Sequence, residues 1–179
     1  FLAITDKLKL NRPLVNPSEE PPVIIEPPVV KEDIEYSNDV LKINFSYPRE
    51  AKVKESLEGD VKKVEVLYSE TVKELDEVEE STLSEGYIFR ITKLKSFNRN
   101  LEEATNVKRQ SFINSCPKSA IISDLKETYV NDFFALRFNI LNCGSDYEIT
   151  YAQNFDHFYE FARIYSGDVG YKQKYASIT

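Results

Sequence analysis

Apolar and polar residues alternate in several stretches of the chain from about residue 34 onward. In VLKINFSYP, every second residue from Leu41 to Tyr47 is apolar, and Pro48 ends the pattern. A period of two is typical of a half-buried strand, because successive side chains point to opposite faces of a sheet. VKKVEVLYS (61–69) also reads as a strand, and in GYIFRITKLKS (86–96) Tyr87, Phe89 and Ile91 alternate with Arg90 and Thr92. We therefore predict three strands in this part of the chain.

A helix is predicted after the third strand. Asn100 and Glu103 have the spacing of a capping box, and Leu101, Ala104 and Val107 follow at helical spacing. The acid-rich residues 70–85 are read as a loop, with a short helix as the alternative. Residues 170–179 resemble the beginning of another helix.

Four aromatic and β-branched runs follow, separated by short polar turns: SAIISDLKETYV, FFALRFNILNC, DYEITYAQ and FYEFARIYSGD. Closely spaced runs of this kind favour an antiparallel meander. The expected fold is α+β and similar to an α/β/α sandwich. It has a mainly antiparallel sheet of six to seven strands and one or two packed helices, preceded by an extended Pro-rich arm.

The N-terminal region has a different composition. Six of the eight prolines fall before residue 29, and proline fixes φ and lacks an N–H donor, which favours extended polyproline II. We expect residues 1–12 to be an arm or an anchor remnant, 13–33 a Pro-rich linker or arm, and 34–179 the folded domain. The linker is apolar for a spacer, so five of its residues are candidates for docking on a partner or on the domain itself: Val23, Ile24, Ile25, Val29 and Val30.

The charge limits the partners. The formal net charge of the 179 residues is −7, and a negative surface repels phosphate groups, which disfavours nucleic acids and anionic membranes. No run approaches the roughly 20 apolar residues of a membrane-spanning helix, so we expect membrane attachment only through an anchor outside this sequence. The chain has no methionine, which fits either a removed leader or a cloning boundary.

The chain has two cysteines, Cys116 and Cys143, and no CxxC spacing. Two buried thiols are one interpretation. A disulfide is favoured because each cysteine adjoins a turn signal, and the bond would close a loop that contributes roughly 3.5 kcal/mol to stability in the chain-entropy model. A disulfide indicates an oxidising, extracytoplasmic compartment.

Candidate catalytic chemistry is sparse. The single histidine, His157, is next to Asp156 and at a turn-to-strand junction, where it is interpreted as a strand-edge residue rather than a general base. No GxSxG, GxGxxG or P-loop motif is present. The acidic residues 74–80 lack the spacing of a calcium loop. We predict no enzyme activity, no cofactor and no metal site.

Tyrosines are frequent in the last third of the chain: Tyr147, Tyr151, Tyr159, Tyr165, Tyr171 and Tyr175. Tyrosine offers a flat contact area with a polar tip, which suits a recognition surface for a protein or a glycan. The alternative is that these rings line the sheet and cover the edge of the core. The first four are the candidate interaction residues of the domain.

The order of these segments resembles the PsbP-like and DcrB-like superfamily of extracytoplasmic bacterial proteins. The resemblance covers residues 34–179 and lies in YSNDVLKINFSYP, GYIFRITKL, NLEEATNVKRQSF, DFFALRFNI and YEITY. It implies a secreted or cell-surface location, often as a lipoprotein, and an accessory, binding or assembly role without catalysis.

Together these observations predict a non-catalytic extracellular or cell-surface interaction module on a Pro-rich tether. Its expected partner is a protein or another copy of the chain, with a glycan as a further option. The alternative is a structural subunit of an extracellular assembly or filament, in which the N-terminal arm adds a strand to a neighbour's sheet.

Overall fold

The computed structural model describes residues 33–58, 61–72, 80, 83–95, 100–154 and 157–167. Contacts divide the chain into two units, Phe1–Val30 and Lys31–Thr179, and all described residues belong to the second. The predictions for the Pro-rich arm and its five docking candidates, for most of the acidic loop and for a C-terminal helix therefore lie outside the described residues.

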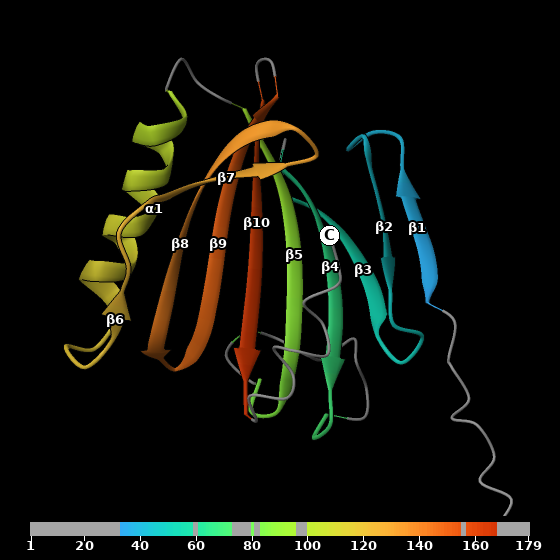
Figure 1. The fold of residues 1–179 in the computed structure, drawn as a ribbon. Coiled ribbons are helices and arrows are strands. Elements are labelled where there is room, and N and C mark those ends of the chain that lie inside the picture. The colour runs from blue at the N-terminus through green and yellow to red at the C-terminus, as the bar shows by residue number, and fades with distance from the viewer. Residues whose placement is uncertain are drawn as a thin grey trace, which may run out of the picture. The chain divides into compact units, whose positions relative to one another are not determined.

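The prediction of an α+β fold with a mainly antiparallel sheet is confirmed (Figure 1). The described residues form one helix, one eight-stranded sheet and a separate two-stranded hairpin. The hairpin consists of β1 (Ile34–Asn38) and β2 (Ile43–Tyr47). In spatial order, the large sheet contains β3 (Lys52–Glu58), β4 (Val61–Ser69), β5 (Gly86–Lys95), β10 (His157–Ser166), β9 (Ser145–Asn154), β8 (Phe133–Cys143) and β6 (Ile121–Ile122), and β7 (Lys126–Val130) also pairs with β8.

Both faces of the large sheet carry apolar side chains, so alternate residues of one strand enter different clusters. In β5, Ile88 belongs to the cluster beneath the helix, whereas Tyr87 and Phe89 belong to the cluster beneath the β1–β2 hairpin. The helix covers the sheet at the β8 end and the hairpin lies at the β3 end (Figure 1). A hairpin therefore takes the place of a second helix layer in the described residues.

The only helix of the described residues, α1 (Leu101–Ser115), begins as predicted. The side chain of Asn100 accepts a hydrogen bond of 2.7 Å from the backbone N–H of Glu103, which satisfies one of the free donors of the first turn. The expected apolar stripe is only partly correct. Leu101 and Thr105 are buried, whereas Val107 is 52% exposed, because the helix turns its Leu101, Thr105 and Phe112 side to the sheet.

The predicted cysteine pairing is confirmed. Cys116 and Cys143 lie at disulfide-bonding distance, with their Cα atoms 5.3 Å apart. Cys116 is the C-terminal cap of α1, and Cys143 is the last residue of β8. The link therefore joins the end of the helix to the strand that it covers.

The hairpin of β7 and β8 folds across the face of the sheet, where β7 crosses β8, β9 and β10 (Figure 1). Its turn residues, Asn131 and Asp132, have φ angles of 46° and 67°, as a tight hairpin turn of type I′ requires. The turn lies between the predicted runs SAIISDLKETYV and FFALRFNILNC, where a short polar turn was expected. The fold-over leaves Tyr129 69% exposed and Phe133 45% exposed on the molecule's surface.

Candidate ligand-binding groove

A groove with a volume of about 450 Å³ lies on the face of the sheet that carries the β1–β2 hairpin. We call it the face groove. Its floor consists of residues of β5, β8, β9 and β10, and its walls are β2 on one side and the β7–β8 turn on the other. Small-ligand sites typically measure about 300 to 1,000 Å³, so the face groove is of a suitable size for one.

Strand register brings three charged side chains together on the floor. Arg163 of β10 is directly opposite Glu148 of β9. On the other side of β9, Asn139 of β8 is opposite Glu148, and Arg137 is the next residue of β8 on the same face. The Nη1 atom of Arg163 is 2.6 Å from one carboxylate oxygen of Glu148, and that of Arg137 is 3.5 Å from the other. We call this group the Arg-Glu-Arg cluster.

Aromatic rings line the groove beside the cluster and farther along the floor. The rings of Phe45 and Phe89 meet edge to face at 5.9 Å, and the guanidinium of Arg163 is 5.7 Å from the centre of the Phe89 ring. Tyr159 donates a hydrogen bond of 3.0 Å to the carbonyl oxygen of Leu41. This bond fixes the ring between β10 and the loop before β2, so the floor is rigid at this point.

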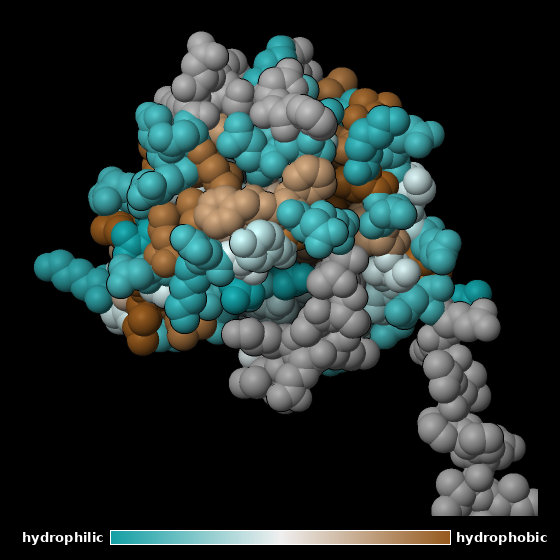
Figure 2. Space-filling view, turned by 45° about the horizontal axis from the view of Figure 1, so that its top comes forward, coloured by the Kyte–Doolittle hydropathy of each residue, from teal (hydrophilic) through white to brown (hydrophobic). Residues whose placement is uncertain are grey.

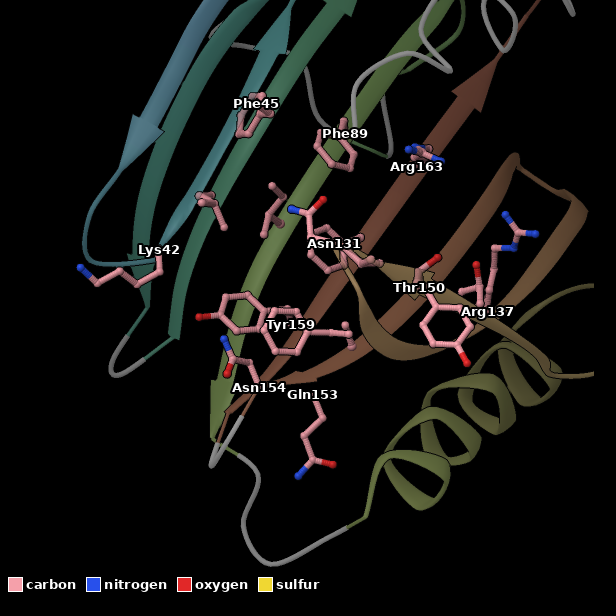
Figure 3. A pocket seen from close by; sticks show the side chains of 18 of the residues that line it. Lys42, Phe45, Phe89, Asn131, Arg137, Thr150, Gln153, Asn154, Tyr159 and Arg163 are labelled. Atoms are coloured by element: carbon pink, nitrogen blue, oxygen red, sulfur yellow. The ribbon is translucent and has the colours of Figure 1, made fainter.

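Neutral polar side chains complete the lining. Figure 3 shows Asn131 among Phe89, Thr150 and Tyr159, with Phe45 and Arg137 farther out on opposite sides. Asn154 is close to Tyr159 in the same view. Its Oδ1 atom is buried and has no hydrogen-bond partner among the described residues. A buried acceptor without a donor is costly, so a ligand donor here would be favourable.

The surface also has exposed apolar side chains. Figure 2 shows hydrophobic side chains gathered in the middle of the face in view, with hydrophilic ones around them. Tyr129, Phe133 and Phe134 are exposed large apolar residues of the β7–β8 hairpin, and the first two line the face groove. The groove therefore has an apolar entrance above a polar and charged floor.

The four candidate tyrosines are not an exposed recognition surface. Tyr147, Tyr151, Tyr159 and Tyr165 are each at most 9% exposed, because both faces of their strands are covered. Tyr147 and Tyr151 lie in the cluster beneath the helix, and Tyr159 and Tyr165 in the cluster beneath the hairpin. The alternative interpretation, that the rings line the sheet, describes their position. Tyr159 also lines the face groove.

Burial raises the pKa of three of these tyrosines. The pKa of Tyr165 is raised to about 12, mainly by burial and also by Glu148, against the opposing effect of Arg163. Burial likewise raises the pKa of Tyr147, with a contribution from Glu80. The pKa of Tyr151 is raised by burial and by its hydrogen bond to Glu160. The phenols of Tyr147, Tyr151 and Tyr165 are therefore neutral at ordinary pH.

His157 is the first residue of β10, opposite Lys95 and Asn154, and does not line the face groove. The described residues that line the face groove include no histidine, cysteine or serine. Within the described ranges, no group of three or more histidine, cysteine or acidic side chains is arranged to hold a metal ion. The lining instead offers cations, amides, hydroxyls and rings, which suit binding.

No protein-family model matches the chain, and no curated protein matches it significantly. None of the helices formed by the described residues has the length and hydrophobicity needed to cross a membrane.

Sequence reasoning missed the Arg-Glu-Arg cluster. Its members come from three strands and are spaced 11 and 15 residues apart in pairs along the chain, as Arg137–Glu148 and Glu148–Arg163. The signal in the sequence was a charged residue inside each of three largely apolar strands, and β9 and β10 carry a second one, Asp146 and Glu160. Only the pairing register shows that these three side chains share one face.

Proposed function

We propose that this protein is a non-catalytic extracellular interaction module, tethered by its Pro-rich segment, which binds its partner in the face groove. The observation that carries the proposal is the combination of an apolar entrance with a floor of charged and amide side chains in one concave site. Convergent polar groups inside an otherwise apolar cleft are typical of binding sites.

The disulfide supports a location outside the cytoplasm. Structural disulfides persist in oxidising compartments and are rare where thiols are kept reduced. The Cys116–Cys143 pair lies between two regular elements, as expected of a structural rather than a catalytic bond. The proposed membership of the PsbP-like and DcrB-like superfamily agrees with this role, because such domains are typically accessory or binding subunits.

The proposal is tested by removing the entrance of the face groove. We expect the full chain to bind selectively to at least one ligand on arrays of glycans and peptides. The double variant Tyr129→Ala/Phe133→Ala should bind that ligand about tenfold more weakly or worse, because loss of two contact rings removes more than about 1.4 kcal/mol. Both side chains are largely exposed, so the fold should be retained.

Leu57→Ala is the matched control, because Leu57 is 63% exposed on β3 and does not line the groove. The control should bind as the wild type does. Equal binding by the double variant, or no ligand on either array, would contradict the face groove as the binding site. Chemical conversion of a bound ligand would contradict the non-catalytic role. Large oligomers of the purified chain that need residues 1–31 would instead support the assembly subunit.

A further inference from the structure

We infer that the face groove takes a saccharide bearing a carboxylate group, with Arg137 as the residue that binds the carboxylate. This inference rests on the proposed binding role of the groove and names the ligand class. The ligand would lay its ring on the aromatic entrance, place its acidic group at the Arg-Glu-Arg cluster and direct hydroxyl groups at the surrounding amides.

The charge of the groove is opposite to that of the protein. The chain carries a formal charge of −7, whereas the described residues that line the groove include three cations and one carboxylate: Lys42, Arg137, Arg163 and Glu148. The two arginines lie on the floor, and the ammonium of Lys42 points away from it (Figure 3). A positive site on an acidic protein attracts an anion locally, while the remaining surface repels polyanions such as nucleic acids. A small ligand with a single acidic group satisfies both conditions.

Of the two arginines in the cluster, Arg137 has more hydrogen-bond donors available for a ligand. Its guanidinium contacts Glu148 through one nitrogen at the long distance of 3.5 Å, and the side chain is 38% exposed. Arg163 is held more closely, with a 2.6 Å contact to the same carboxylate and 20% exposure. Since a guanidinium has five N–H donors in a planar fork, Arg137 can still bind a carboxylate with two parallel hydrogen bonds.

The neutral lining favours a ligand rich in hydroxyl groups. Four lining residues with an amide or a hydroxyl share a face with the floor or lie in the β7–β8 turn: Thr128, Asn131, Thr150 and Asn154. Amides and hydroxyls both donate and accept hydrogen bonds, as sugar hydroxyls do. The buried Oδ1 atom of Asn154 requires a donor, which a hydroxyl group supplies and a carboxylate does not.

The aromatic entrance of the groove suits the apolar faces of a sugar ring. A pyranose ring presents C–H groups on its faces, and these pack on an aromatic ring, while its hydroxyls project from the rim. Tyr129 and Phe133 are exposed and line the groove. Both belong to the β7–β8 hairpin, whose turn forms one wall. They are therefore available for stacking without a change in the core.

A peptide fits the floor less well. Peptides commonly bind a sheet by adding a strand to an open edge. The floor strands β5, β9 and β10 each have a paired neighbour on both sides, so their backbone groups are already occupied. The floor must recognise its ligand through side chains, and an acidic peptide is the competing outcome of the experiment.

The test uses the full chain and isothermal titration calorimetry with oligosaccharides of galacturonate, glucuronate and sialate. We expect at least one of them to bind, and its methyl ester, which has nearly the same shape without the charge, to bind about tenfold more weakly or worse. Arg137→Gln should cause a similar loss. Arg137→Lys should recover only part of the affinity, because a lysine keeps the charge without the fork.

Lys118→Gln is the matched control, since Lys118 is an exposed cation in the turn after α1 and does not line the groove. Its affinity should equal that of the wild type. Equal affinity for acid and ester, or no binding of any of the three acids, would overturn the inference. Binding of a hexaglutamate peptide in place of the sugars would also overturn it, yet would leave the face groove as a binding site. Circular dichroism of each variant confirms that it is folded.

Discussion

Tyr165 is 8% exposed and lies beside the ring of Tyr87, with the ring centres 5.5 Å apart. Its neighbours on the same face of β10 include Arg163 of the Arg-Glu-Arg cluster. Ionisation of the phenol would place a negative charge among apolar rings, which is why burial raises its pKa to about 12 from the usual 10.0. The stability of the fold therefore depends on this proton at high pH.

The pKa shift of Tyr165 predicts a loss of stability in alkaline solution. Below pH 10 both the folded and the unfolded chain hold the proton, so stability does not change. Between pH 10 and 12 the unfolded chain releases the proton first, so the free energy of unfolding falls, by up to about 2 kcal/mol for this residue. Urea denaturation measured at several pH values should show a shallower fall for Tyr165→Phe than for the wild type. An identical pH dependence of the two proteins would contradict the prediction.

Gly86 is required because the backbone of the neighbouring strand leaves no room for a side chain at this position. A Cβ atom at this position would lie 2.2 Å from the carbonyl oxygen of Tyr68. The first residue of β5 must therefore be glycine for β4 and β5 to pair at this end. The sequence shows this glycine but does not show the neighbouring strand that requires it.

At the scale of elements, α1 is held on the sheet by a polar contact and a covalent one. Lys108 of the helix lies 3.3 Å from the buried carboxylate of Glu160, which also accepts a hydrogen bond from Tyr151. At the end of the helix, Cys116 is linked to Cys143. The two attachments fix the helix near its middle and at its C-terminus.

Removal of the disulfide should lower the free energy of unfolding by about 3.5 kcal/mol, because the unfolded chain regains the freedom of a 27-residue separation. Urea denaturation of the double variant Cys116→Ser/Cys143→Ser, compared with the wild type, measures this difference. The wild type treated with a phosphine reductant is the second arm and should show a similar loss. A change below about 1 kcal/mol in both arms would contradict the structural role of the bond.

The helices and strands that could be predicted are those marked by a local feature of the sequence, such as alternation or a capping residue. The strand at β5 and the start of α1 at Asn100 were predicted because alternation and capping are local features. β1 and β3 were missed, because β3 is an edge strand rich in charged residues and β1 is only 5 residues long. The run SAIISDLKETYV was expected to be one strand but forms β6 and β7, since Ser123 between them bonds to the backbone of Asn139.

At the scale of the whole molecule, the sequence could not separate core from surface. In a sheet with both faces covered, the alternation of residues no longer indicates which side chains meet solvent. For this reason Tyr147 and Tyr159, on opposite faces, are both buried. The face groove was missed for a related reason, because it depends on the fold-over of β7 and on the register of three strands, which are non-local properties.

The second unit of the chain should be independent of the Pro-rich arm. Among the described residues, the buried members of both apolar clusters lie between Leu41 and Tyr165. We therefore expect a variant that lacks residues 1–31 to unfold at the same temperature as the full chain, within about 3 °C. It should also bind the groove ligand with unchanged affinity. Differential scanning calorimetry and calorimetric titration measure the two quantities, and sedimentation velocity compares the oligomeric states.

A large drop in unfolding temperature would mean that the arm belongs to the core. Loss of oligomers with an unchanged unfolding temperature would favour the assembly subunit over the tethered module, because an arm that joins neighbouring copies stabilises their association and not the fold.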